Sequence, residues 1–279
     1  MNGTEVFADG VLAGRGVLVT GGGTGLGRAA AAELRRCGAE VVICGRRADV
    51  LAATAAELGL HHVAGDVREE DDAERILGFA LERCGRLDAL VNNAGGQYFT
   101  PAEAIEPKGW QAVTRLNVGA TERMTRLAAE LAFLPARGGT VVNVTLSPHH
   151  GLAGMTHSSA ARAAVEGYTR ALADEWADRG IAVIAVAAGH FDTASLRKYP
   201  EAVWRAAART VPLQRLGREA EHAWLVALCC TPLGAALSGS VVTLDGARDN
   251  WFGPWPPESL AGDGGEVPTE SRGPKPPGS

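Results

Sequence analysis

The sequence of 279 residues lacks several features that would direct it to particular classes of protein. No apolar run is long enough to cross a bilayer, so we expect no membrane-spanning segment and no membrane partner. Basic residues are not in excess, because 27 Lys and Arg stand against 32 Asp and Glu, for a net charge of −5. A nucleic-acid binder that works by counterion release is therefore not expected. The first residues show no basic segment followed by an apolar one, so we expect no secretory signal and a cytoplasmic location.

Cysteine is also scarce. There are five cysteines, an odd number without metal-ligand spacing, which favours reduced thiols over a disulfide framework or a zinc site. Hydrophobic residues make up 46% of the chain, which is enough for a sizeable core.

Between about residues 14 and 246, short β-branched runs alternate with long alanine-rich stretches. We expect strands over residues 17–20, 41–44, 62–64, 90–92, 140–144, 181–187 and 240–244. Helices are expected over residues 26–37, 49–58, 71–84, 108–134 and 158–178. This alternation indicates βαβ units, and strands that are apolar throughout are typical of a sheet covered on both faces. We therefore predict one doubly wound α/β domain over residues 1–250, with a parallel seven-stranded sheet and helices on both faces.

The last residues differ in composition from this body. Residues 251–255 read Trp-Phe-Gly-Pro-Trp, which is too aromatic for a solvated linker, so we expect them to pack on the body or on a neighbouring subunit. The remainder is rich in Pro, Gly, Ser and charged residues and is predicted to be disordered. Residues 251–279 are thus predicted to form a partly disordered C-terminal tail.

A glycine-rich turn joins the first expected strand to the first expected helix. It reads Thr20-Gly21-Gly22-Gly23-Thr24-Gly25-Leu26-Gly27. Glycines there permit a tight turn and let backbone N–H groups approach a pyrophosphate at the positive end of a helix. A flexible loop is the alternative, but the strand–turn–helix context favours nucleotide binding. The predicted contacts are Gly21, Gly23, Thr24, Gly25, Leu26 and Gly27.

The end of the second expected strand indicates which dinucleotide is bound. An NAD site carries an acid there for the ribose 2′-hydroxyl, but this chain has Cys44-Gly45-Arg46-Arg47. A guanidinium pairs well with phosphate oxygens, so Arg46 and Arg47 favour NADP(H). The alternative is that both arginines are simply solvated at the start of a helix.

Further short motifs follow in order along the chain. They are Asp66-Val67, Asn92-Asn93-Ala94-Gly95, Asn117, Thr193 and Leu244-Asp245-Gly246. Together with the glycine-rich turn, they resemble the short-chain dehydrogenase/reductase family over nearly the whole body of the chain. The resemblance implies a Rossmann-like fold, a homodimer or homotetramer, and an active-site role for Asn117. It also implies cofactor contacts from Asp66, Val67, Asn93, Ala94, Gly95, Gly189 and Thr193.

Within this family, two segments are most similar to the 2-enoyl-CoA and dienoyl-CoA reductase branch. They are Gly95-Gly96-Gln97-Tyr98 and His157-Ser158-Ser159-Ala160-Ala161-Arg162. The chain departs from the family at its Tyr-x-x-x-Lys motif, where Tyr exchanges a proton with substrate and Lys holds the nicotinamide ribose. Ser158 and Arg162 occupy those two positions, and the position of an upstream Ser falls at Leu146, or at Thr145 or Ser147 if the loop is shifted.

The replacement changes the expected chemistry. Ser158 and Arg162 lie four apart, on one helix face, and Arg162 can still hold ribose hydroxyls. An aliphatic hydroxyl is a poor general acid near neutral pH. Tyr98 and Tyr199 are alternative proton donors or packing residues, whereas Tyr168 lies too far along the helix. Loop histidines are a further alternative: His157 first, then His149, His150 and His190. We expect no metal site among them.

The loss of Tyr favours reduction of a C=C bond conjugated to a thioester, because the enolate oxygen can be stabilised by hydrogen-bond donors alone. The first hypothesis is an NADP(H)-dependent oxidoreductase acting on a small molecule, either an activated alkene or a related carbonyl compound and possibly a thioester. Residues 194–216, which include Tyr199 and Trp204, are expected to form its lid. Asn117, Ser158, Arg162, His157 and Tyr98 are the candidate catalytic residues. The alternatives are a non-redox cyclase, isomerase or lyase on the same scaffold, or a catalytically inactive homologue that serves as a binding partner.

Overall fold

The computed structural model describes residues 6–194, 196–198 and 206–250. The predicted C-terminal tail over residues 251–279 lies outside the described residues, as do Tyr199 and Trp204 of the predicted lid.

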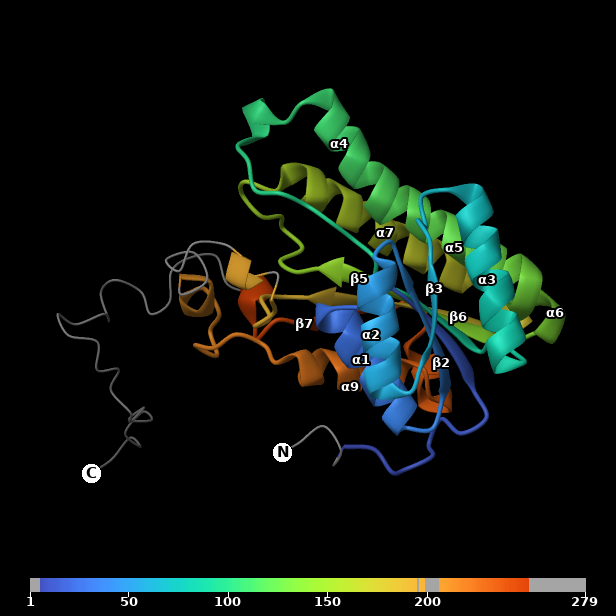
Figure 1. Ribbon diagram of the computed structural model, residues 1–279. Helices are drawn as coiled ribbons and strands as arrows, with labels where there is room; N and C mark the ends of the chain where they lie inside the picture. Colours follow the sequence, from blue (N-terminus) through green and yellow to red (C-terminus); the bar gives the residue numbers. More distant parts are fainter. Residues whose placement is uncertain (1–5, 195, 199–205, 251–279) are drawn as a thin grey trace, which may run out of the picture.

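All seven predicted strands form one parallel sheet (Figure 1). Its order is β3-β2-β1-β4-β5-β6-β7. Strands β2 and β3 are added on one side of β1 and strands β4 to β7 on the other, so the strand order reverses between β1 and β4. The strands are β1 (Gly16–Thr20), β2 (Glu40–Gly45), β3 (His61–Ala64), β4 (Ala89–Asn92), β5 (Gly139–Leu146), β6 (Ile181–Ala188) and β7 (Val241–Leu244). The predicted fold class, a doubly wound α/β domain, is therefore confirmed.

Helices cover both faces of the sheet (Figure 1). They are α1 (Gly25–Arg36), α2 (Ala48–Leu58), α3 (Glu70–Cys84), α4 (Pro107–Thr114), α5 (Ala120–Ala128), α6 (Leu134–Ala136), α7 (Thr156–Glu175) and α9 (Glu219–Cys229). The helix expected over residues 108–134 is present but is divided by two π-helical turns, Arg115–Gly119 and Ala129–Phe133. The helix expected over residues 158–178 begins earlier, at Thr156, and ends at Glu175, before a 3₁₀ turn. Helix α9 was not predicted.

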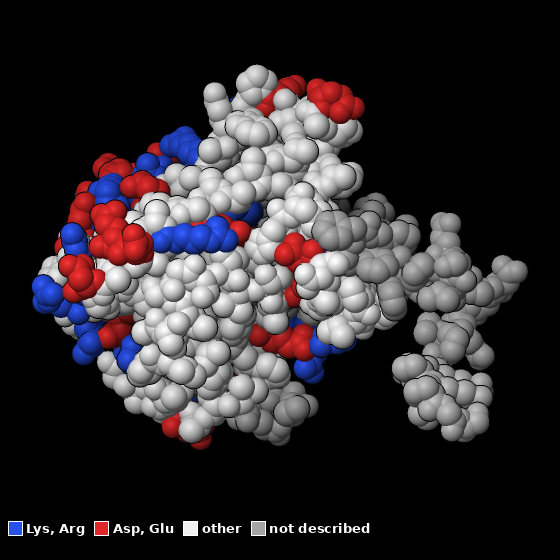
Figure 2. Space-filling view, turned by 180° about the vertical axis from the view of Figure 1, so that it is seen from behind, with Lys and Arg blue, Asp and Glu red and all other residues white. Residues whose placement is uncertain are grey.

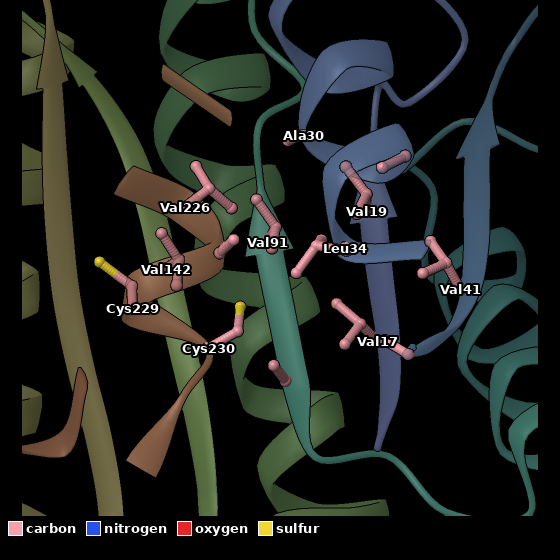
Figure 3. Packing of buried hydrophobic residues seen from close by; sticks show 14 of the residues in the cluster. Val17, Val19, Ala30, Leu34, Val41, Val91, Val142, Val226, Cys229 and Cys230 are labelled. Carbon is pink, nitrogen blue, oxygen red and sulfur yellow. The ribbon is translucent and has the colours of Figure 1, made fainter. Parts of the chain in front are cut away.

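Alternate residues of the strands enter two separate cores. Val17 and Val19 of β1 pack with α1, α2 and α9 on one face, whereas Leu18 between them packs with α3, α5 and α7 on the other. Figure 3 shows part of the first core, where Val91 and Val142 lie close to Val226 of α9. This two-sided burial is why the strands are apolar throughout.

Charged side chains lie mainly in mixed pairs at the surface. On the side of α3, Glu70 pairs with Arg123 (2.6 Å) and Arg126 (2.5 Å) of the next covering helix. Figure 2 shows acidic and basic side chains intermingled along one flank, and a broad area across the middle of this face with few charges. None of the helices in the described part of the chain is long and apolar enough to span a membrane.

Candidate cofactor cleft and active site

A cleft of about 820 Å³ opens at the carboxyl ends of the parallel strands. It lies around the point where the strand order reverses, which is where doubly wound sheets bind ligands. Every cofactor contact predicted from the sequence lines it: Gly21, Gly23, Thr24, Gly25, Leu26, Gly27, Arg46, Arg47, Asp66, Val67, Asn93, Ala94, Gly95, Arg162, Gly189 and Thr193. The structure thus brings together residues from five loops and from helix α7 that are far apart in the sequence.

The glycine-rich turn has the geometry that an anion needs. Gly21 and Gly25 both have positive φ, +67° and +53°, which side chains other than glycine rarely adopt. A Cβ on Gly27 would collide with Asn93, so helix α1 approaches the strand closely only because this residue is glycine. The first turn of α1 holds no acidic residue, and its N-cap Thr24 forms no side-chain cap. The free N–H groups at this helix end therefore suit a pyrophosphate.

Asn93 and Thr20 fasten the two turns that flank this cradle. Asn93 donates its side-chain N–H to the Thr20 carbonyl (2.9 Å), while the backbone N–H groups of Asn93 and Ala94 both donate to the Thr20 hydroxyl (3.0 Å each). These bonds hold the loop after β4 against the loop after β1. The cradle is thus rigid before any ligand binds.

The far end of the cleft carries Arg46 and Arg47, which follow β2. Arg46 also borders an adjoining hollow of about 310 Å³, shared with Asp66 and Arg75. The Asp66 carboxylate is bound by the Arg68 guanidinium (Nε to Oδ1 2.9 Å), a hydrogen bond that lowers the pKa of Asp66. The Asp66 carboxylate is therefore already paired with a cation of its own loop.

Arg162 lies at the base of the cleft, one turn along α7 from Ser158. Its Nη1 donates to the Val144 carbonyl (2.7 Å), but its buried Nε has no hydrogen-bond partner among the described residues. Burial lowers the pKa of Arg162 to about 10, so the group stays charged at neutral pH. A Cβ on Gly95 would collide with this guanidinium, which explains why glycine is needed there. A buried cation with an unused donor is suited to oxygen atoms of a ligand.

Asn117 lies behind the cleft wall rather than on it. Its side-chain N–H groups donate to the carbonyls of Gly96 and Val113 (2.8 Å each), and its Oδ1 accepts from the Gly96 N–H (3.2 Å). The π-helical turn over Arg115–Gly119 contains Asn117. The side chain of Asn117 therefore shapes the loop after β4.

Ser158 is fully buried and also does not line the cleft. Its hydroxyl donates to Oε1 of Gln97 (2.9 Å), and Gln97 does line the cleft. With Oε1 occupied, the amide N–H groups of Gln97 remain as donors toward the cleft. Gln97 is a functional candidate that sequence reasoning missed. An amide two residues after Gly95 has no spacing that marks it as functional.

His157 and Tyr98 pack on each other, with ring centroids 4.5 Å apart. The expectation that His157 lies in a loop is wrong, since it sits in the first turn of α7. It is fully buried, and burial lowers its pKa. The Tyr98 hydroxyl lies against Gly109, where a Cβ would collide with it. Neither side chain lines the cleft.

The three loop histidines are placed differently from one another. His190 lines the cleft and lies 2.6 Å from the Arg248 guanidinium, and burial together with this cation lowers its pKa to about 4. His149 contacts Glu166 of α7, and His150 lies 3.8 Å from Asp249. Neither His149 nor His150 lines the cleft.

Comparisons with known proteins agree with this geometry. The model of the short chain dehydrogenase family matches residues 15–204. The chain is 34% identical over 253 residues to a probable 2,4-dienoyl-CoA reductase of Bacillus subtilis (strain 168), covering 87% of this chain and 98% of that protein. It is 36% identical over 246 residues to the 3-hydroxyacyl-CoA dehydrogenase type-2 of Drosophila melanogaster, covering 82% and 95%.

A search of solved structures also finds a dehydrogenase with a similar fold. A citronellol catabolism dehydrogenase of Pseudomonas aeruginosa PAO1 superposes with a TM-score of 0.78 at 35% identity, covering 88% of this chain and 98% of that one. By their names, these similar proteins are oxidoreductases.

Proposed function

Because this chain belongs to the short-chain dehydrogenase family, whose members use nicotinamide cofactors, we propose that it is an NADP(H)-dependent oxidoreductase that reduces an activated C=C bond of a thioester. The glycine-rich turn would hold the pyrophosphate, and Arg46 and Arg47 the 2′-phosphate. Arg162 would hold the nicotinamide ribose through its unused donor, and Thr193 the carboxamide. When bound, the reduced nicotinamide would supply a hydride to the substrate.

One observation carries this choice of reaction: the reacting end of the cleft offers hydrogen-bond donors, but no described tyrosine lines it. Gln97, held by Ser158, can donate an amide N–H to a developing enolate oxygen, which needs stabilisation but not immediate protonation. A simple carbonyl would need a proton at its oxygen during the same step, and neither Gln97 nor Arg162 is an effective acid at neutral pH.

The remaining lining at this end suits an acyl chain. Leu116, Leu152, Met155 and Leu196 line the cleft, as Gln97 does. Apolar walls with a small number of donors are typical of sites that bind an apolar substrate in one orientation. The B. subtilis relative, named as a probable dienoyl-CoA reductase, supports a thioester of this kind.

The decisive experiment follows the loss of NADPH absorbance with a panel of enoyl-CoA, dienoyl-CoA and simple ketone substrates. We expect turnover with the unsaturated thioesters and much less with the ketones. An NADPH that binds tightly but is never oxidised by any substrate would contradict the proposal and favour a non-redox reaction on the same scaffold.

Cofactor preference is tested by Arg46→Ala and Arg47→Ala. Loss of one charge-assisted contact to the 2′-phosphate should weaken NADPH binding by about 10- to 100-fold. NADH has no 2′-phosphate, so its affinity should change little. The control is Arg115→Ala, because Arg115 forms an exposed ion pair with Glu69 on the helical layer. Equal weakening of NADPH and NADH binding would contradict the assignment.

We further propose that the protein forms a homodimer or homotetramer through α7. Five small residues of this helix are exposed in the single chain: Ala160, Ala163, Ala164, Gly167 and Ala171. Such a surface allows two helices to approach closely. Light scattering should show a smaller species for Ala164→Glu, whereas Ala53→Glu, at an exposed alanine of α2, should leave the assembly unchanged.

A further inference from the structure

Reduction of a C=C bond needs a proton as well as a hydride, and the family's usual tyrosine is absent at Ser158. We propose that Thr145, Glu166, His149 and Thr243 form a proton relay that carries a solvent proton from the protein surface into the cleft. This inference rests on the proposed function, which the relay would serve.

The inner end of the relay is Thr145, on β5. Thr145 lines the cleft, and its hydroxyl lies 3.1 Å from Oε1 of Glu166. It is the residue next to Leu146, where the family pattern would place a serine. Because this hydroxyl contacts both the cleft and a buried carboxylate, it can accept a proton from Glu166 and release its own proton into the cleft.

Glu166 is the second member and is shielded from water, with 8% of its side chain exposed. It follows Arg162 by one turn of α7, so the two side chains project from the same face toward β5. The same Oε1 that meets Thr145 lies 3.0 Å from Nδ1 of His149. One carboxylate oxygen thus joins the cleft hydroxyl to the imidazole.

His149 is the third member, in the loop between β5 and α7, and 28% of its side chain is exposed. Because Nδ1 faces a carboxylate, it carries the ring proton, and Nε2 is then the acceptor. Nε2 lies 3.0 Å from the hydroxyl of Thr243, an exposed residue of the edge strand β7. The chain of contacts therefore runs without a gap from the surface to the cleft.

Other charged groups surround the relay without interrupting it. Arg170, one turn further along α7, lies 3.9 Å from Oε2 of Glu166. Asp249 lies 3.8 Å from Nε2 of His149 and accepts a hydrogen bond from the His149 backbone N–H (2.5 Å), while His150 lies 3.8 Å from Asp249.

One transfer restores Thr243, Glu166 and Thr145 and leaves His149 with its proton on Nε2, and the part-exposed ring regains the Nδ1–H tautomer by proton exchange with water. A solvent proton passes through the Thr243 hydroxyl to Nε2 of His149, and the Nδ1 proton moves to Glu166. The Thr145 hydroxyl, which donates to Glu166 at rest, turns toward the cleft once Glu166 is protonated. Glu166 then passes its proton to the Thr145 oxygen, while the Thr145 hydroxyl proton leaves into the cleft and neutralises the carbanion of the enolate. The reduced cofactor provides the hydride, so substrate, NADPH and one proton give the saturated product and NADP⁺.

The alternative is that these contacts only fix the loop between β5 and α7. The two readings differ for substitutions that keep the loop in place but stop proton transfer. Thr145→Val removes the hydroxyl without changing side-chain volume, and Thr145→Ser restores it. Glu166→Gln keeps the hydrogen-bonding shape but cannot exchange a proton in the same way. His61→Gln, at a partly exposed histidine on β3, is the matched control.

The experiment measures single-turnover NADPH oxidation and product formation with the thioester that the wild-type protein reduces best. A relay predicts that Thr145→Val, Glu166→Gln and His149→Ala each slow product formation by about tenfold or more, with unchanged NADPH affinity. It predicts recovery in Thr145→Ser and, on adding imidazole, in His149→Ala, because the vacated site is open to solvent. His61→Gln should match the wild type. Melting curves identify any variant that fails to fold.

A second readout needs neither cofactor nor substrate. NMR should show a slowly exchanging Nδ1–H signal of His149 that is lost in Glu166→Gln and kept in His61→Gln. Absence of that signal in the wild type, no rescue by imidazole, or full activity in Thr145→Val would each overturn the relay. An inactive wild type with every thioester would instead overturn the proposed function, and the relay with it.

Discussion

At the scale of single residues, the proposed function gives Ser158 a role that depends on its contact with Gln97. A tyrosine at this position would extend into the cleft, whereas the Ser158 hydroxyl is fully buried and reaches only Oε1 of Gln97. In the proposed reaction Ser158 is therefore a positioning residue, and the Gln97 amide, which lines the cleft, is the group that would touch substrate. A buried hydroxyl that fixes an amide orientation reduces the entropy lost when the donor meets an enolate oxygen.

A double-mutant cycle tests this dependence. Gln97→Ala should lower kcat by about 10- to 100-fold through loss of one donor, with little change in KM for NADPH. Ser158→Ala should lower kcat by a smaller factor, because the amide is present but loose. If Ser158 acts through Gln97, the double variant loses no more than Gln97→Ala alone. Additive losses in kcat would show that Ser158 acts independently.

The residues predicted from backbone chemistry all line the cleft, while their roles stay predictions. The glycine-rich turn and the Asn93–Gly95 turn were identifiable because only glycine fits their φ values and close approaches. Prediction from the sequence failed for Gln97 and misplaced His157, because a side chain's direction depends on packing between distant segments. The Ser158–Gln97 contact joins residues 61 apart in the sequence.

At the scale of elements, a chain of buried amides and hydroxyls holds the central strands to their covering helices. Asn92 of β4 donates to Thr125 of α5 and to Asn143 of β5 (2.9 Å each). Asn143 in turn donates to Thr169 of α7 (2.9 Å). All four side chains are buried, so each depends on its neighbours for hydrogen bonds. The network fixes α7, and with it Arg162, relative to the sheet.

The variant Asn143→Leu measures how much this network contributes to the free energy of unfolding. Leucine has about the same volume as asparagine, but it cannot form the hydrogen bonds to Asn92 and Thr169. Leaving these two buried groups without a partner should lower the free energy of unfolding by about 2 to 4 kcal/mol. Urea denaturation measures the loss, and the isosteric Thr140→Val on the same strand is the control. A loss equal to that of Thr140→Val would mean that the amides are not coupled.

Element prediction was accurate for the strands but less so for the helices. Apolar runs bounded by polar residues locate buried strands well, whereas α9 was missed because apolar residues lie on all its sides and leave no period. Its burial against α1 explains that composition. The π-helical turns were also not foreseeable, since each inserts one residue that the local sequence does not mark.

At the scale of the whole molecule, folding lowers the pKa of His190 and of His222 to about 4. His222 of α9 is 0% exposed, its ring nitrogens have no partner among the described residues, and burial lowers its pKa to about 4. Its ring packs edge-on against Phe191, which lines the cleft, with centroids 5.9 Å apart. Burial and the Arg248 guanidinium lower the pKa of His190 to about 4 as well.

These histidines make stability depend on pH in one direction. Both have folded-state pKa values below the 6.5 of a free imidazole, so the unfolded chain binds protons first as pH falls. Their contribution is complete above about pH 6.5 and is lost as pH falls toward about 4, at roughly 2 kcal/mol for His222 by pH 5. His222→Phe removes that titration while keeping a ring, so its unfolding free energy should fall less between about pH 7.5 and pH 5 than that of the wild type. Urea titrations at both pH values measure the difference, and His61→Phe, at an exposed site, should follow the wild type. An equal fall in His222→Phe and wild type would mean that water reaches His222 in the folded protein.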